Sequence, residues 1–163
     1  MGKTESYITV VGETAAEYTE KRSRFIATLK HCETEEEAAE FINALKSEYW
    51  DARHNCYAYS VENGALKRFS DDGEPHGTAG KPILSVIEGV SITNVCIVVT
   101  RYFGGVLLGT GGLVRAYTKA AADAAAKITK AVMTPGTVFS AESDYSSAER
   151  LAKLIADAGA SVE

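Results

Sequence analysis

Apolar and polar residues follow patterns along the chain that predict a mixture of strands and helices. In SRFIATLK (23–30) the apolar side chains alternate onto one face, which is typical of a strand, and SYITVVG (6–12) predicts an earlier strand that ends at Gly12. We expect both strands in one antiparallel sheet. NVCIVVT (94–100) is almost wholly apolar and rich in β-branched residues, which predicts a central strand buried on both faces and ending at Arg101.

Three segments carry helical signals, over residues 34–47, 81–89 and 111–128. Thr34 precedes Glu37 by three residues, the spacing of a capping box, and the acidic first turn complements the helix dipole. The second segment begins near a proline and carries an apolar face up to a glycine. The third follows a glycine-punctuated loop, and its alanines permit close packing against a sheet.

A turn dipeptide, Asn63-Gly64, separates two strand-like runs, so residues 55–69 are predicted to form a hairpin. We therefore expect an α+β fold: a two-layer sandwich of an antiparallel-rich sheet of four or five strands with the three helices on one face.

The stretch TPG (134–136) marks a domain boundary, and residues 1–132 form the first predicted domain. Beyond the boundary we predict a strand in TVFSAES (137–143), a helix in SSAERLAKLIADAG (146–159) and the start of a strand in ASVE (160–163). Three such elements cannot close a core alone. We therefore expect residues 133–163 to be a truncated unit or one completed by further contacts.

The composition indicates a soluble globular protein: 163 residues, 45% hydrophobic and 24% charged. No stretch approaches the roughly 18 apolar residues of a membrane span, and the start of the chain lacks a signal-peptide pattern, so the cytoplasm is expected and a membrane partner is not. Cys32, Cys56 and Cys96 are far apart and suggest reduced thiols rather than disulfides or a thiolate zinc site.

The net charge of −5 argues against a general nucleic-acid coat. Between Arg101 and Lys130, however, five basic residues stand against Asp123 alone, a local charge of +4. The loops GTAGKP (77–82) and GTGGLVR (109–115) each lead into a helix N-terminus with a basic residue nearby, and such ends attract anions. The alternative is that the glycines only allow tight turns, since neither loop matches a Rossmann or P-loop motif.

The segment SDDGEPHGTAGKP (70–82) offers the main candidates for chemistry. Its carboxylates and histidine, with His54, are plausible metal ligands, but the two-histidine helical spacing is missing, so we expect neither a metal nor a cofactor. A turn held by aspartate side chains is the simpler interpretation. His54 and Cys56 share a strand face, but that spacing alone does not make a catalytic dyad.

Five aromatic residues lie near these loops: Tyr57, Tyr59, Tyr102, Phe103 and Tyr117. The alternating Tyr57 and Tyr59 could form a stacking platform for bases, although aromatics on a strand more often pack against a helix.

Three blocks together, ARHNCYAY, SDDGEPHGTAGKPIL and VVTRYFGGVLLGTGGLVRAY, resemble in order and spacing the signatures of the YigZ/IMPACT family, over about residues 17–130. The resemblance implies an N-terminal domain similar to a ribosomal-protein domain and to domain IV of elongation factor G. It also implies that residues 133–163 begin a ferredoxin-like domain. Leu107 stands where many members carry lysine.

The resemblance implies a regulator of translation among the eukaryotic members and RNA or ribosome binding for this chain, whose exact role is unsettled. The residues expected to bind nucleic acid or another anion are Lys81, Arg101, Gly104, Gly105, Gly109, Thr110, Gly111, Gly112, Arg115 and Lys119. A possible loop site comprises Asp71, Asp72, Glu74, His76, Thr78 and Gly80.

Three alternatives stay open for these residues. One is an enzyme, a hydrolase or transferase acting on a phosphorylated small molecule, with Asp71, Asp72 or His76 in acid–base roles. Another is that Arg101 and Arg115 pair with the acidic loop as structural ties. The third is the binding surface itself, formed by both loops.

Overall fold

The computed structural model describes residues 6–161, which contain seven strands, four α-helices and one 3-10 turn. The strands are β1 (Tyr7–Val11), β2 (Glu13–Glu20), β3 (Ser23–His31), β4 (His54–Val61), β5 (Leu66–Ser70), β6 (Val95–Tyr102) and β7 (Thr129–Met133). The helices are α1 (Glu35–Glu48), the 3-10 turn η1 (Glu62–Gly64), α2 (Gly80–Gly89), α3 (Gly109–Lys127) and α4 (Ala148–Asp157).

Five strands form the main sheet in the order β2-β3-β6-β4-β5, and every neighbouring pair is antiparallel. β6 lies in the centre, and each of its residues from Val95 to Arg101 is buried, as its apolar run predicts. The hairpin prediction is confirmed by β4 and β5, joined by η1 with Asn63 and Gly64 at positive φ. The predicted α+β class and antiparallel sheet are therefore confirmed.

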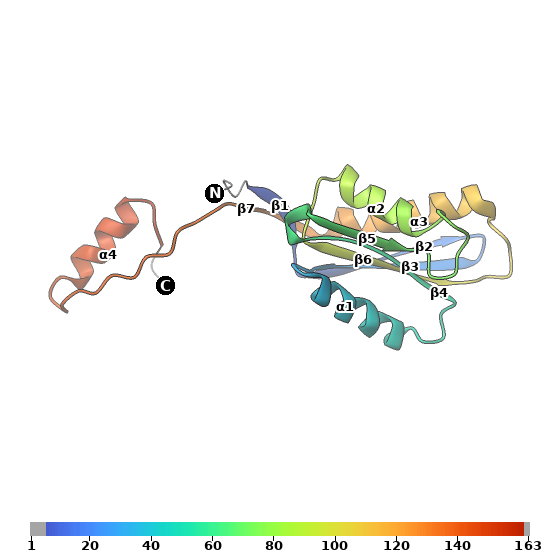
Figure 1. The fold of residues 1–163 in the computed structure, drawn as a ribbon, viewed down its shortest axis with the longest axis horizontal. Helices are drawn as coiled ribbons and strands as arrows, with labels where there is room; N and C mark the ends of the chain where they lie inside the picture. Colours follow the sequence, from blue (N-terminus) through green and yellow to red (C-terminus); the bar gives the residue numbers. More distant parts are fainter. Residues whose placement is uncertain (1–5, 162–163) are drawn as a thin grey trace.

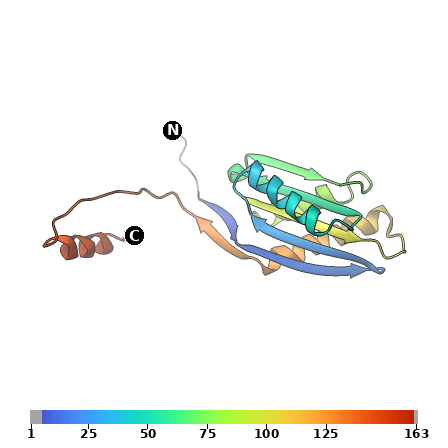
Figure 2. The ribbon, with the colours of Figure 1, turned by 90° about the horizontal axis from the view of Figure 1, so that it is seen from below.

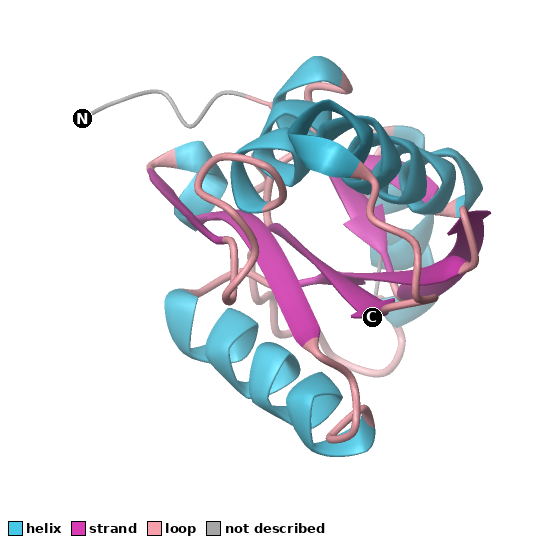
Figure 3. Cartoon of the chain, turned by 90° about the vertical axis from the view of Figure 1, so that its right-hand side faces the viewer, coloured by secondary structure: helices cyan, strands magenta, loops and turns pink. Residues whose placement is uncertain are grey.

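Helices cover both faces of this sheet (Figure 1). α2 and α3 lie on one face, whereas α1 lies on the other, as the end-on view also shows (Figure 3). The expectation of two layers with all three helices on one face is therefore wrong. The physical reason is that β6 presents apolar side chains to both faces, and each face requires a cover.

Two apolar clusters fill the spaces between the layers. The larger contains Phe25, Ile97 and Tyr117, and the alanines of α3 allow that helix to lie close to the sheet. The smaller joins Phe41 and Leu45 of α1 to the opposite face. α1 begins as its capping pattern predicts, because the Glu37 amide donates to the Thr34 hydroxyl over 3.2 Å.

The N-terminal strands differ from the sequence prediction. β1 does not belong to the main sheet but pairs with β7 in a separate two-stranded ribbon (Figure 2). Gly12, at φ +75°, separates β1 from β2, which the sequence analysis did not predict and which pairs with β3. Lys21 and Arg22, both at positive φ, form the turn between β2 and β3.

Residues 134–161 contribute a helix but no strand. α4 confirms the predicted helix, whereas the strand predicted at 137–143 is wrong: that segment is irregular and its side chains are exposed. The strand predicted at 160–163 is not seen at Ala160 or Ser161, and its last two residues lie outside the described part. The assignment of 133–163 to a ferredoxin-like domain stays a prediction, as does the likeness to the elongation-factor domain. None of the helices within residues 6–161 has the length and apolar composition that crossing a bilayer requires.

Candidate functional site

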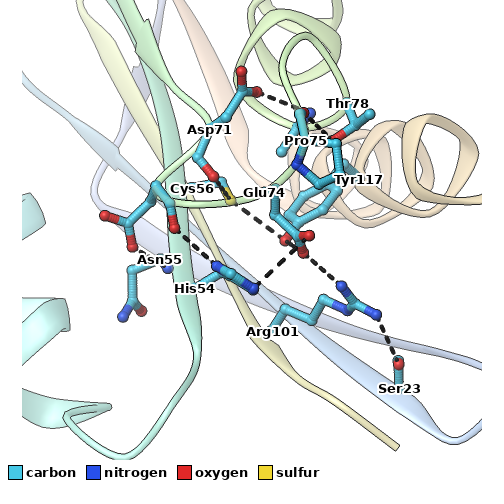
Figure 4. A network of polar contacts seen from close by, with 12 residues as sticks. Ser23, His54, Asn55, Cys56, Asp71, Glu74, Pro75, Thr78, Arg101 and Tyr117 are labelled. Carbon is cyan, nitrogen blue, oxygen red and sulfur yellow. Dashed lines mark hydrogen bonds and ion pairs between the residues drawn. The ribbon is translucent and has the colours of Figure 1, made fainter. Parts of the chain in front are cut away.

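The signature segment 70–82 folds inward between β5 and α2, and Glu74 is its buried centre (Figure 4). Its Oε1 accepts hydrogen bonds of 2.7 Å from both Arg101 Nη1 and the Tyr117 hydroxyl. Arg101 Nη2 reaches Ser23 Oγ at 3.3 Å. One carboxylate thus links the loop to β6 and α3, and Arg101 extends the link to β3.

Arg101 is buried rather than presented to solvent. Its side chain is 7% exposed, and its guanidinium carbon lies 5.6 Å from the ring centroids of both Phe25 and Phe103. Its Nε atom is buried and has no hydrogen-bond partner within the described part of the chain. The sequence left open whether Arg101 binds a ligand or pairs with the acidic loop. The geometry agrees with the second alternative, because the guanidinium already has a buried counter-ion in that loop.

Asp71 caps the N-terminus of α2. Its two carboxylate oxygens accept from the amides of Gly77, Ala79 and Gly80 over 2.8–3.1 Å. Burial alone would raise the pKa of Asp71, but these N–H groups outweigh it and hold the pKa below its usual value. The donors predicted to receive an external anion at this loop are therefore occupied by the chain's own carboxylate.

We expect Asp71→Asn to lower the free energy of unfolding by about 1–2 kcal/mol at pH 7, because a neutral amide binds the three N–H groups less strongly. The folded-state pKa is depressed, so the carboxylate stabilises fully above its unfolded pKa of about 4, and this contribution is lost as pH falls through the folded-state value. Urea denaturation at pH 7 and pH 3 should show the difference between variant and wild type shrinking at the lower pH. Asp157→Asn, on exposed α4, is the control, and a difference that is the same at both pH values would contradict the capping role.

Asp72 is also engaged within the fold. Its carboxylate accepts from the Asn55 amide at 2.7 Å and from Lys46 Nζ at 2.8 Å, and its carbonyl lies 2.8 Å from His54 Nδ1. His76, by contrast, is fully exposed. Acid–base roles for Asp71 or Asp72 would require these carboxylates to leave their present partners.

Thr78 and Gly80, the remaining candidates of the loop, contact backbone atoms of the same chain. The Thr78 hydroxyl donates to the Pro75 carbonyl at 2.6 Å. Gly80 packs against Ser70 so closely that a Cβ would lie 2.8 Å from its backbone atoms. Lys81 is exposed in the first turn of α2.

Cys56 and the strand tyrosines belong to the packing of the sheet. The Cys56 thiol lies 3.0 Å from the Asp71 carbonyl and 3.3 Å from the Tyr117 hydroxyl, and burial raises its pKa, which opposes thiolate formation. Tyr57 and Tyr59 stack on each other with ring centroids 6.2 Å apart and pack against the apolar cluster of α1. This is the packing against a helix that the sequence offered as the alternative to a platform for bases.

A groove of about 330 Å³ lies between α3 and the β2–β3 hairpin. Its lining residues are Tyr18, Glu20, Lys21, Leu108, Gly112, Arg115, Ala116 and Lys119. Among the described residues, no side chain accepts a hydrogen bond at the N-cap of α3. At the start of α2, by contrast, the Asp71 carboxylate accepts from the amides of Ala79 and Gly80. Arg115 Nη1 lies near this turn, because a Cβ on Gly111 would be 3.4 Å from it.

The structure does not bring all the predicted anion-binding residues together. Gly109, Thr110, Gly111 and Gly112 form the first turn of α3, with Arg115 and Lys119 along the groove, and Lys119 pairs with Asp123. Arg101 lies in the interior instead.

The loop glycines before α3 also differ in their environments. Gly104 packs against the backbone of Arg22, where a Cβ would overlap the Arg22 carbonyl, and Gly105 adopts φ +87°. Lys21 and Arg22 were not among the predicted residues, although two adjacent basic residues ahead of a predicted strand are visible in EKRSR (20–24).

A comparison with protein families identifies the family to which the chain belongs. The model of the Impact N-terminal domain matches residues 21–125. The chain belongs to the IMPACT family. The predicted membership is thereby confirmed, and the matched part includes the β2–β3 turn, the acidic loop and most of α3.

Several IMPACT family proteins are similar over most of this chain. The IMPACT family member YvyE of Bacillus subtilis is 48% identical over 72% of this chain and 55% of its own length, and YigZ of Escherichia coli is 42% identical over 77% and 63%. The chain thus spans 55–63% of the length of these two relatives. A crystal structure described as a hypothetical protein is 40% identical, with a TM-score of 0.77 over 81% of this chain and 66% of that one. The translational regulator Yih1 is 29% identical, with a TM-score of 0.48 over 72% and 47%.

Proposed function

We propose that the chain is a translation-associated domain that binds RNA or a ribosomal surface through the groove between α3 and the β2–β3 hairpin. The observation that carries the proposal is a set of cations without counter-ions. Among the residues that the structure describes, Lys21, Arg22 and Arg115 make no ion pair, although the whole chain has a net charge of −5.

The groove offers phosphate two kinds of donor. The uncapped first turn of α3 has backbone N–H groups that lack partners within the helix, and Arg115 lies beside them. Lys21 lies on the opposite wall. An arrangement of this kind suits phosphate groups along a nucleic-acid backbone, which position a protein without reading sequence.

The translational part of the proposal comes from family membership. The YigZ/IMPACT resemblance implies regulators of translation among eukaryotic members. Structured RNA of the translation machinery is therefore the partner class that we favour for this groove.

We expect Arg115→Ala to weaken RNA binding and to reduce the slope of log affinity against log salt by about 0.7–0.9, the contribution of one phosphate contact. Fluorescence anisotropy with a labelled RNA hairpin across a salt series measures this change. Arg68→Ala, an exposed arginine on β5 at the far edge of the sheet, should leave both affinity and slope unchanged.

Melting curves separate binding from folding for these variants. Arg115→Ala should melt like the wild type, because Arg115 is exposed and makes no ion pair among the described residues. Unchanged affinity and slope in a folded Arg115→Ala variant would remove the groove as the RNA site.

A further inference from the structure

An exposed aromatic ring lies on the loop after β6, next to the residue that packs against the β2–β3 turn. Phe103, directly after β6, keeps 41% of its surface accessible, and the loop behind it exposes Val106 at 40% and Leu107 at 82%. The phosphate contacts proposed above give these apolar side chains no role. Large apolar side chains grouped on one exposed loop indicate a contact surface.

The ring of Phe103 contacts a buried side chain. The Arg101 guanidinium lies over the ring at 5.6 Å from its centroid, and Glu74 fixes that guanidinium in turn. The next residue, Gly104, is confined between the Arg22 backbone and the Ser23 hydroxyl, which accepts from its amide at 3.3 Å. A ring fixed in this way loses little conformational entropy when a ligand stacks on it.

Lys21 and Arg22 in the β2–β3 turn make no ion pair among the residues that the structure describes. The close contact between Gly104 and Arg22 places the β2–β3 turn against the loop that carries Phe103. Lys21, in the same turn, lines the groove that also contains Arg115. Phosphate-binding groups therefore continue from the groove to the neighbourhood of the ring.

We propose that Phe103 stacks on an unpaired base of the bound RNA, so that the site selects single-stranded or looped segments over continuous duplex. This inference rests on the proposed function and adds a specificity to it. Bases within a duplex are covered by their neighbours, whereas an unpaired base offers its flat face to an aromatic side chain. The charge of the surrounding groups favours RNA over a neutral apolar partner.

The test compares two RNAs of the same sequence, one single-stranded and one annealed to its complement, with 2-aminopurine replacing one adenine in the single strand. Phe103→Leu keeps an apolar side chain but removes the aromatic face. We expect it to weaken single-strand binding by about 5- to 150-fold, the range of one base–aromatic stack, and to leave duplex binding within about twofold. Quenching of 2-aminopurine on binding should be lost in Phe103→Leu and restored in Phe103→Tyr.

Two further variants make the outcomes distinguishable. Phe69→Leu, at a 44% exposed phenylalanine on β5, should bind both RNAs like the wild type. Arg115→Ala should weaken both RNAs alike. If Arg115→Ala weakens both while folded Phe103→Leu weakens neither, stacking is overturned and the proposed function stands. If the wild type binds neither RNA at low salt, both proposals fall.

Phe103-dependent binding to vesicles of phosphatidylserine and phosphatidylcholine, without preference for single-stranded RNA, would assign the surface to a membrane and overturn stacking.

Discussion

Arg101→Ala is expected to lower the free energy of unfolding by about 3–5 kcal/mol, because buried Glu74 loses its hydrogen-bonded counter-ion and is left with His54 Nε2 at 3.8 Å from its other carboxylate oxygen. Glu74 is 3% exposed at its side chain, and Arg101 Nη1 is the cation within 2.7 Å of it. Removing the guanidinium also leaves Ser23 Oγ without that contact and removes the cation between two aromatic rings. Urea denaturation followed by circular dichroism measures the change.

Arg24→Ala is the matched control for this experiment. Arg24 also forms an ion pair, with Glu17 at 2.6 Å, but both side chains are about half exposed, so its loss should cost less than about 1 kcal/mol. Arg101→Met, which fills the space without the charge, should still be strongly destabilised because Glu74 remains. Similar stabilities for the Arg101→Ala and Arg24→Ala variants would contradict the role of the buried pair.

Gly104→Ala is expected to cost about 3 kcal/mol, at the upper end of the range for overpacking. A Cβ at this position would overlap the carbonyl carbon and oxygen of Arg22, which are backbone atoms and cannot rotate away. Either the β2–β3 turn or the loop after β6 must move. Chemical denaturation measures the loss, and amide hydrogen exchange should rise at both segments.

Gly89→Ala provides the comparison for Gly104→Ala. Gly89 ends α2, and no atom would lie within 4 Å of a Cβ there, so the substitution should be neutral or slightly stabilising. If Gly104→Ala is as stable as Gly89→Ala, the close approach of the two loops is not a constraint on the fold. RNA affinity should also fall in Gly104→Ala, since the displaced turn carries Lys21.

Local patterns were sufficient to predict the elements with strong signals. The cap at Thr34, the turn at Asn63-Gly64 and the apolar run of β6 each depend on residues close in sequence. Which face α1 occupies is a long-range property, and the sequence analysis placed it wrongly. The burial of β6 on both faces was itself predicted, however, and that pattern already required cover on both sides of the sheet.

The two missed strands lacked local signals for different reasons. β2 is an edge strand made mostly of small and charged residues, and only one of its side chains is fully buried. β7 pairs with β1, and this pairing places Tyr7 opposite Met133. A sequence pattern within a short window cannot predict a partner that is so far away along the chain.

The candidate site was predicted in outline but not in its internal bonding. The sequence brought attention to the acidic loop, yet only the folded chain places Asp71 against the amides of Ala79 and Gly80, eight and nine residues later. The burial of Arg101 follows from its position at the end of a buried strand. The contribution of Lys21 depends on a hairpin that was not predicted.

The ribbon of β1 and β7 bears on how a fragment of this domain should be delimited. Residues 21–125, the segment matched by the family model, exclude both of these strands together with β2. Val10, Ala16 and Ile128 all lie outside that segment and are buried in the larger apolar cluster. A truncation at the family borders would therefore open the interior and create a new sheet edge at β3, so we expect a fragment that folds on its own to include residues Tyr7 to Met133.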